Sequence, residues 1–224
     1  AQWNHSVDLK GKRVASIGTG ASAIQYIPEI APIVKQLYVH QRTPAWVLPR
    51  DERAYTRSEK KLFKQIPLIR KLHRYSQYWF NETRLLPIRN PTASRLLSKV
   101  AATNIRNAID DPAIVKKLTP DYSIGCKRVL ISNTFYPAFN RSNVELVTEG
   151  IKEVTPEGII TQDGKKRDVD VIVLGTGFVV DPRQYLKSFP IQGLGGRNLL
   201  DTWKKGAESY LGMTVPGYPN LFQM

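Results

Sequence analysis

A glycine-rich stretch near the amino terminus has the spacing of a dinucleotide-binding turn. Gly18, Gly20 and Ala23 form a G-x-G-x-x-A pattern. The first glycine of such a pattern permits a tight turn, and the second lets a pyrophosphate approach the backbone. The free amide groups at the start of the following helix can then bind the phosphates. The predicted nucleotide contacts are Gly18, Thr19, Gly20, Ala21, Ser22, Ala23 and Gln25.

The residues about one β-α-β unit further along favour a phosphorylated dinucleotide. NAD and FAD sites usually have an acidic residue about 20 positions after the glycines. This chain has Gln41, Arg42 and Thr43 there instead. A guanidinium can hold a 2′-phosphate with paired hydrogen bonds, whereas a carboxylate repels it. The sequence therefore predicts NADPH or NADP as the ligand of Arg42 and Thr43. An exposed arginine without a ligand is the alternative interpretation.

The elements around these residues predict a Rossmann-like α/β fold. Val14 to Ile17 form a short apolar run before the glycines, and Ile24, Ile27 and Ile30 then recur at helical spacing. Leu37 to Val39 predict a second strand. Together they make a β-α-β unit, which requires a parallel sheet.

The segment 51–120 has the pattern of an inserted helical subdomain. Thr56 and Glu59 form a capping box, and Pro67 and Pro91 stand where first helical turns would begin. Asp111-Pro112 predicts a last short helix. Two apolar stripes are expected to pack inward. They are Leu68, Leu72, Tyr75 and Trp79, and then Leu96, Val100, Ala101, Ile105 and Ile109.

Strand patterns return after Gly125. The apolar run 169–174 resembles a central strand, and hairpin turns at Glu157-Gly158 and Asp163-Gly164 predict a β-meander beside the parallel sheet. After Phe178 the chain becomes rich in proline and glycine, which indicates another domain. The predicted strands are 14–17, 37–39, 129–131, 144–147, 151–154, 159–161 and 169–174.

The charge of the chain is uneven. Its formal net charge is +14, and residues 51–120 hold 15 Lys or Arg against 6 Asp or Glu, which places +9 in the helical segment. A basic segment with aromatic residues could bind nucleic acid, so a nucleic-acid-binding module is a distant alternative. We expect no nucleic acid partner, because lysines and arginines on solvent-facing helix surfaces are ordinary.

Several other classes are disfavoured by composition. Cys126 is the single cysteine, so an internal disulfide is impossible, and a buried small side chain is its expected role. The histidines His5, His40 and His73 lack zinc-site spacing, and we predict no metal. No apolar stretch approaches the roughly 20 residues of a membrane span, and the first residues contain no signal peptide. Stable membrane insertion is not expected, and the cytoplasm is the default location.

The stretch GTGASA followed by HQRTPAWVLPR resembles the second nucleotide motif of Baeyer–Villiger monooxygenases, which are class B flavoprotein monooxygenases of the FMO-like type. The similarity continues in order through CKRVLISNTFYPAFN, DVDVIVLGTGF and YLGMTVPGYPNLF. Trp3 lies where the tryptophan of the family fingerprint F-x-G-x-x-x-H-x-x-x-W is expected. A plain packing aromatic is the alternative for Trp3.

This resemblance implies roles for further residues. Lys127 matches a lysine that joins Arg42 and Thr43 at the 2′-phosphate. Arg128 matches the catalytic arginine that stabilises a negatively charged flavin–oxygen intermediate. Thr176 and Gly177 match a turn near bound nucleotide, with glycine at position 175 in place of the usual alanine. A surface pair and an ordinary strand-to-loop turn are the respective alternatives.

The resemblance also implies an activity and a domain division. The full-length enzyme would use NADPH, FAD and O2 to insert one oxygen atom into ketones, giving esters or lactones. An N- or S-oxygenating flavin monooxygenase is the nearest alternative, and a disulfide reductase matches less well. No oligomeric state is predicted, and the chain by itself is expected to be inactive. The expected divisions are a linker from an FAD domain outside the chain (1–10), the NADP-binding domain (11–50 and 121–180), the helical insertion (51–120) and the truncated start of a returning FAD or substrate domain (181–224).

Overall fold

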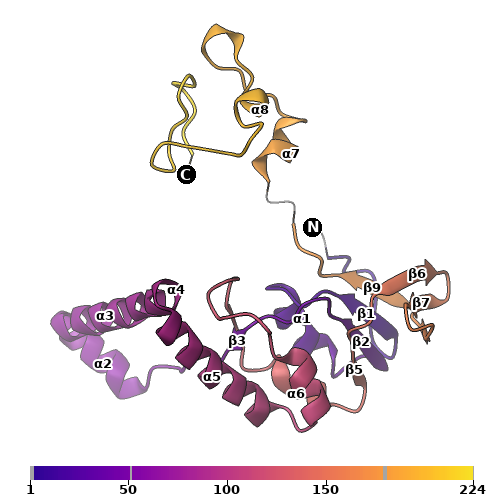
Figure 1. The fold of residues 1–224 in the computed structure, drawn as a ribbon. Coiled ribbons are helices and arrows are strands. Elements are labelled where there is room, and N and C mark those ends of the chain that lie inside the picture. The colour runs from indigo at the N-terminus through magenta and orange to yellow at the C-terminus, as the bar shows by residue number, and fades with distance from the viewer. Residues whose placement is uncertain (1–2, 51, 179–180, 224) are drawn as a thin grey trace. The chain divides into compact units, whose positions relative to one another are not determined.

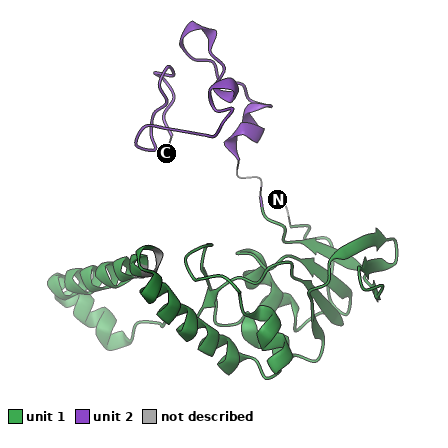
Figure 2. Ribbon diagram, viewed as in Figure 1, with its two compact units in different colours: residues 1–177 green, residues 178–224 purple. Residues whose placement is uncertain are grey.

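The computed structural model describes residues 3–50, 52–178 and 181–223. The chain divides into two compact units, residues 1–177 and residues 178–224 (Figures 1 and 2). The first unit holds both the sheet and the helical segment. No described helix is long and apolar enough to cross a membrane.

A parallel sheet organises the first unit. Strand β1 (Arg13–Ile17) lies between β2 (Gln36–His40) and β9 (Val171–Leu174), and β2 pairs on its other side with β5 (Val144–Val147). All three pairings are parallel. Helix α1 (Ala23–Ile30) connects β1 to β2. The predicted Rossmann-like α/β arrangement is therefore confirmed.

The core of this unit forms from the apolar pattern that predicted it. The α1 residues Ile24, Ile27 and Ile30 are buried with Leu37 and Val39 of β2. Alternate strand residues point to opposite faces. The two faces of the sheet therefore pack against different elements.

Strand β9 differs from its expected central position. It is at the end of the sheet order β5-β2-β1-β9 among the described residues. Val171, Ile172 and Val173 are only half-buried, and Leu174 is exposed. The apolar run was a poor guide here, because burial depends on which neighbours a strand has and not on its own composition.

The predicted meander is present as a separate antiparallel sheet. It consists of β6 (Ile151–Thr155), β7 (Gly158–Thr161) and β8 (Lys166–Asp168), the last of which was not predicted. Ile159 of β7 packs in one cluster with Ala15 of β1. The meander therefore covers one face of the parallel sheet.

The helical segment starts and stops where local signals predicted. It contains α2 (Arg57–Gln65), α3 (Pro67–Glu82), α5 (Pro91–Ala108) and α6 (Pro112–Leu118). Thr56 and Glu59 form the predicted capping box, and Asp111 accepts the cap hydrogen bond of α6. A 3₁₀ turn (Thr83–Leu85) and the short α4 (Leu86–Arg89) connect α3 to α5.

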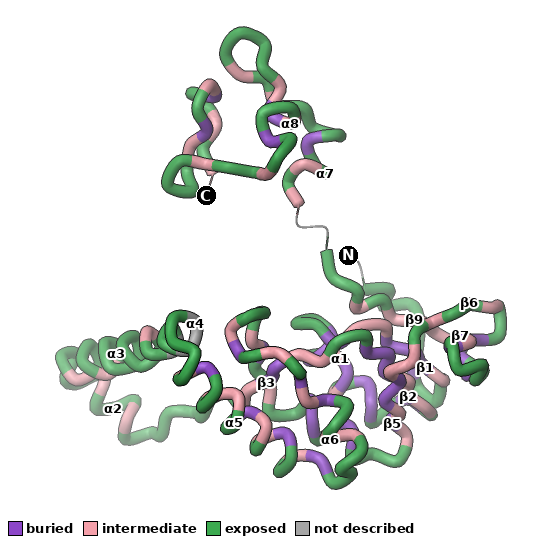
Figure 3. The backbone as a smooth tube through the Cα atoms, in the orientation of Figure 1, coloured by how far each residue is buried: buried purple, intermediate pink, exposed green. Residues whose placement is uncertain are grey.

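The predicted packing of these helices is wrong in part. Helices α2 and α3 contain no buried residue, and Figure 3 shows them as exposed or intermediate along their length. In α5 only the later part of the stripe is buried. No described residue covers the apolar residues of α3 or of the first part of α5. The helical spacing therefore predicted correctly that each helix has an apolar face, but it could not predict whether that face is buried. The exposed stripe residues are Leu68, Leu72, Tyr75, Trp79, Leu96 and Val100.

A two-stranded parallel pair links distant parts of the chain. Strand β3 (Val47–Leu48), which was not predicted, pairs with β4 (Leu130–Ile131). A 3₁₀ segment (Tyr136–Asn140) then leads back to β5. Cys126, in the loop before β4, is exposed and not buried as expected. The prediction of a buried Cys126 was wrong because a surface loop lacks the apolar neighbours that bury a small side chain.

The second unit is small and mostly irregular. Helix α7 (Pro182–Leu186), a 3₁₀ turn (Leu194–Gly196) and helix α8 (Leu199–Thr202) are its helical elements. One apolar cluster holds it together. This cluster consists of Leu186, Leu199, Trp203, Val215 and Tyr218.

Candidate nucleotide-binding site

The carboxyl ends of the parallel strands meet at one edge of the sheet. The Gly18 amide donates to the carbonyl of His40 at 2.9 Å, and the Gly175 amide donates to that of Ile17 at 2.8 Å. The Gln41 amide donates to the carbonyl of Val147 at 2.8 Å. This carboxyl edge, where the loops after β1, β2, β5 and β9 lie together, is the usual ligand position in open α/β sheets.

Gly18 and Gly20 lack side chains for different reasons. Gly18 has φ +106°, and a Cβ there would lie 2.4 Å from the carbonyl oxygen of Gly175. Gly18 therefore permits the close approach of the β1 and β9 ends. A Cβ on Gly20 would meet nothing within 4 Å. Packing therefore gives no reason for the glycine at position 20.

The start of α1 leaves donors available. Ser22 makes no side-chain cap, and the described part of the chain offers no acceptor to the amides of Ala21, Ser22 and Ala23. The Ala23 side chain is fully buried, so its backbone alone can face a ligand. Gln25 is exposed, and its Nε2 donates to the Ala21 carbonyl at 2.7 Å. These donors lie next to the carboxyl edge.

Tyr26 explains why position 175 holds glycine. A Cβ on Gly175 would lie 2.5 Å from Tyr26 Oη. That hydroxyl is hydrogen bonded to Ser16 Oγ at 2.8 Å, and burial raises the pKa of Tyr26. The ring of Trp3 lies 5.9 Å from the Tyr26 ring. Sequence analysis missed Tyr26, although its place one helical turn after Ser22 could have indicated that it returns towards β1.

The residues after β2 separate into one that points inward and two that are exposed. Gln41 is buried, and its Nε2 donates to the Lys117 carbonyl at 2.9 Å. Arg42 and Thr43 are exposed. Within the described residues neither side chain has a hydrogen bond or ion pair. A free guanidinium and a hydroxyl therefore stand at the carboxyl edge.

Pairing of β3 with β4 brings Lys127 towards the same region. Strands β3 and β4 are parallel, and Val47 pairs with Leu130. Pro44 lies three residues before Val47, and Lys127 lies three residues before Leu130, so both residues lie at the same end of the strand pair. Tyr122 Oη donates to the Pro44 carbonyl at 3.0 Å, and Lys127 Nζ lies 4.5 Å from the centre of the Tyr122 ring. Burial raises the pKa of Tyr122, which keeps the hydroxyl protonated. Tyr122 was also missed by sequence analysis.

The other predicted site residues differ in their exposure. Thr19 is buried, while Thr176 and Gly177 are exposed in the loop after β9. The Thr176 amide lies close to Gly18, at 3.6 Å from the Cβ position there. Arg128 is exposed next to Lys127, and no described residue pairs with it. No group of described residues could hold a metal ion.

The chain is similar in sequence to known monooxygenases. No family model matches the chain. It is 48% identical over 223 residues to a Baeyer–Villiger monooxygenase of Pseudomonas aeruginosa, covering 99% of this chain and 42% of that protein. Along nearly its whole length, the chain is therefore similar to part of a flavoprotein monooxygenase of the Baeyer–Villiger type. A Streptomyces coelicolor Baeyer–Villiger monooxygenase is 43% identical, with 99% and 42% covered. The chain thus spans less than half of these relatives.

Solved structures agree with this relationship. OTEMO in complex with FAD and NADP superposes with a TM-score of 0.80 at 33% identity, over 97% of this chain and 47% of OTEMO. An oxidised steroid monooxygenase bound to NADP gives a TM-score of 0.80 at 31% identity, over 99% and 49%. The family resemblance and the fold class predicted from sequence are confirmed.

Proposed function

We propose that the chain is the NADP(H)-binding part of an FAD-dependent monooxygenase. The whole protein would use O2 to insert one oxygen atom beside a ketone carbonyl, giving an ester or lactone. The observation that supports this most is the 48% identity to a Baeyer–Villiger monooxygenase over 99% of this chain. The geometry of the carboxyl edge supports the nucleotide part independently.

The pyrophosphate of the nucleotide fits at the start of α1. The open space above Gly20 admits a ligand close to the backbone, and the amides of Ala21, Ser22 and Ala23 have no hydrogen-bond acceptor among the described residues. A helix start favours negative charge because its amides are unpaired and its dipole is positive there. Thr19 and Gln25 are the further nucleotide contacts proposed at this turn.

The 2′-phosphate fits beside Arg42, Thr43 and Lys127. Within the described residues, Arg42 and Thr43 have no side-chain hydrogen bond or ion pair, and Lys127 Nζ lies over the Tyr122 ring. A guanidinium offers two parallel donors to a phosphate, and a lysine adds a point charge. This set would favour NADP over NAD. Thr176 and Gly177 would line the β9 side of the same edge.

Arg128 is the proposed catalytic residue. When bound, the flavin supplies the oxygen chemistry, which belongs to the cofactor itself. Arg128 would present a fixed positive charge towards the anion that forms during oxygen transfer. Its exposed, unpaired guanidinium is consistent with a partner outside this chain. Most FAD contacts would lie in the rest of the protein, in which residues 1–10 and 181–224 would join the FAD domain. We also assign the protein to the cytoplasm.

The first test is a calorimetric titration of the chain with NADP and NAD. NADP is expected to bind more tightly, and Arg42→Ala should remove most of that preference. Arg57→Ala, at an exposed position in α2, is the matched control for lost charge. Equal binding of NADP and NAD by a folded chain would contradict the phosphate assignment.

The oxygenation itself needs the full-length protein. Ketone-dependent NADPH consumption with ester formation is expected, and Arg128→Ala should abolish ester formation while leaving NADP binding unchanged. Oxidation of amines or sulfides alone would overturn the ketone assignment in favour of an N- or S-oxygenating enzyme.

A further inference from the structure

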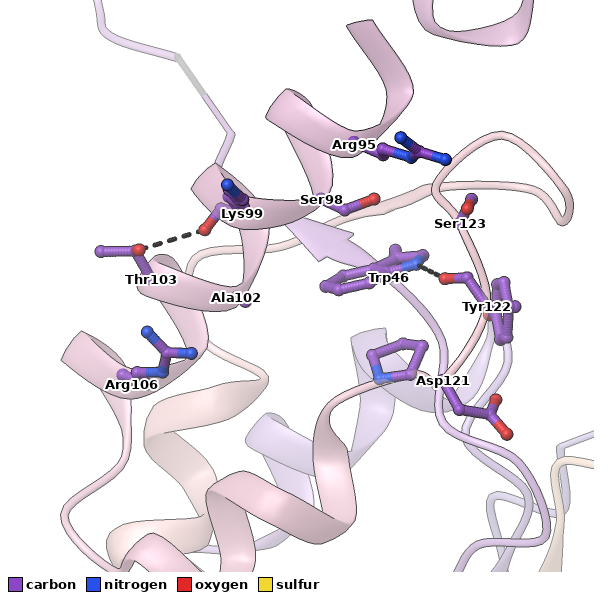
Figure 4. A pocket seen from close by; sticks show the side chains of 11 residues that line it. Trp46, Arg95, Ser98, Lys99, Ala102, Thr103, Arg106, Asp121, Tyr122 and Ser123 are labelled. Atoms are coloured by element: carbon purple, nitrogen blue, oxygen red, sulfur yellow. Dashed lines mark hydrogen bonds between the residues drawn. The ribbon is translucent and has the colours of Figure 1, made fainter. Parts of the chain in front are cut away.

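A hollow with a cationic lining lies beside α5. It has a volume of about 670 Å³ and is bordered by α5 and residues 120–123 (Figure 4). No residue predicted to bind the nucleotide lines it. We name it the basic hollow. Its cationic lining residues are Arg95, Lys99 and Arg106.

The three cations share one side of α5. Their spacings of four and seven residues return to the same helical face. All three are exposed, and none forms an ion pair within the described residues. Asp121 is the acidic residue of the lining, and in Figure 4 its carboxylate points away from them. The basic hollow therefore keeps a positive charge of about two, the difference between three cations and one carboxylate.

The walls of the basic hollow are held in place by hydrogen bonds. Ser94 Oγ donates to the Ile124 carbonyl at 2.8 Å, and the Ile124 amide donates to Ser98 Oγ at 3.1 Å. Trp46 Nε1 donates to the Tyr122 carbonyl at 2.8 Å. These contacts tie α5 and Trp46 to residues 122–124. The cations therefore stand on a rigid frame.

The floor is apolar. Trp46, Ala102 and Pro120 line the basic hollow beneath the charges, and Tyr122 lines the end nearest to Lys127. Small-molecule sites commonly combine an apolar surface with a few convergent polar groups. A ligand with a flat apolar body and an anionic end would match both features.

We propose that the basic hollow binds a small organic phosphate monoester. A phosphate ester carries about 1.5 to 2 negative charges at neutral pH, which matches the remaining positive charge better than a single carboxylate does. Arginine side chains bind phosphate with paired donors. The ester's apolar body would lie against Trp46, Ala102 and Pro120. No residue proposed to bind the nucleotide lines the basic hollow, although Tyr122, which lines it, also contacts Lys127.

The test is a calorimetric titration of the chain with phenyl phosphate, inorganic phosphate and phenol. Phenyl phosphate should bind at one site and more tightly than either of the others. Arg95→Gln and Arg106→Gln should each weaken binding about twofold to fivefold, since exposed ion pairs contribute up to roughly 1 kcal/mol. The double variant should weaken binding further, by about the product of the two effects. Circular dichroism checks that each variant is folded.

Two matched controls locate the ligand. Lys116→Gln removes an exposed charge from α6, outside the basic hollow, and should leave binding unchanged. Lys127→Gln should also leave it unchanged. Loss of binding in Lys127→Gln but not in the hollow variants would place the phosphate at the nucleotide site and overturn the proposal. Phenol binding as tight as phenyl phosphate, or no binding at millimolar ligand, would overturn it as well.

Discussion

Replacing each of the two fingerprint glycines by alanine should have opposite consequences. Gly18→Ala places a Cβ 2.4 Å from the backbone carbonyl oxygen of Gly175. Residue 18 also has a φ of +106°, which an alanine rarely adopts. Overpacking against backbone costs about 1 to 3 kcal/mol, and an unfavourable φ costs about 1 to 3 kcal/mol more. We expect Gly18→Ala to destabilise the sheet by about 2 to 6 kcal/mol.

Gly20→Ala is the matched control within the same turn. Its Cβ would meet no atom within 4 Å, and its φ does not lie in the left-handed range. The stability change should stay within about 1 kcal/mol. NADP affinity should nevertheless fall, because the methyl group would stand where the phosphate approaches the backbone.

Urea unfolding and hydrogen exchange of residues 11–24 and 169–178 measure the first effect, and calorimetry with NADP measures the second. Faster exchange at both strand ends is expected in Gly18→Ala alone. Unchanged exchange and urea midpoint in Gly18→Ala would refute the close-approach argument. A Gly20→Ala chain that is equally destabilised would show that both glycines are needed for folding.

Three further predictions concern the same unit. Gly175→Ala should destabilise the chain by about 1 to 3 kcal/mol. Tyr26→Phe in the Gly175→Ala background should restore part of that stability, because it removes the clashing hydroxyl. A double-mutant cycle of urea midpoints measures the coupling, and simple additivity of the two changes would contradict it. Hydrogen bonds from Arg13 lower the pKa of Asp170 to about 2. Their contribution to folding stability is therefore complete above the ordinary carboxyl pKa and is lost as pH falls from about 4 to about 2. Hydrogen exchange of the β9 amides should become faster over that pH range, and Asp170→Asn should flatten this pH dependence. Thr56→Ala should weaken α2 by about 1 kcal/mol, seen as faster exchange confined to that helix, because no buried residue compensates for the lost cap.

The carboxyl edge of the sheet could be predicted from the sequence because its signals are local. A glycine turn, an apolar strand before it and an amphipathic helix after it are neighbours in the chain. The order of strands around them then follows from the rules for parallel sheets. Gly18, Gly20, Arg42 and Thr43 accordingly lie at one edge, as expected.

Packing between distant segments could not be predicted. Tyr26 fills the space that a side chain at position 175 would occupy, and this depends on a contact across about 150 residues of chain. Lys127 comes near Pro44 only because β3 pairs with β4. No local pattern encodes either contact.

Sequence alone determined which residues form the turn, the caps and the alternating strands, since these depend on backbone geometry and on near neighbours. Tertiary structure alone decided which apolar faces are buried. The periodicity of Leu72 and Ile105 is similar, yet Ile105 is fully buried and Leu72 is 59% exposed. Amphipathic spacing gives a helix an apolar face, whereas burial requires a second surface, and only the folded chain shows where one is present.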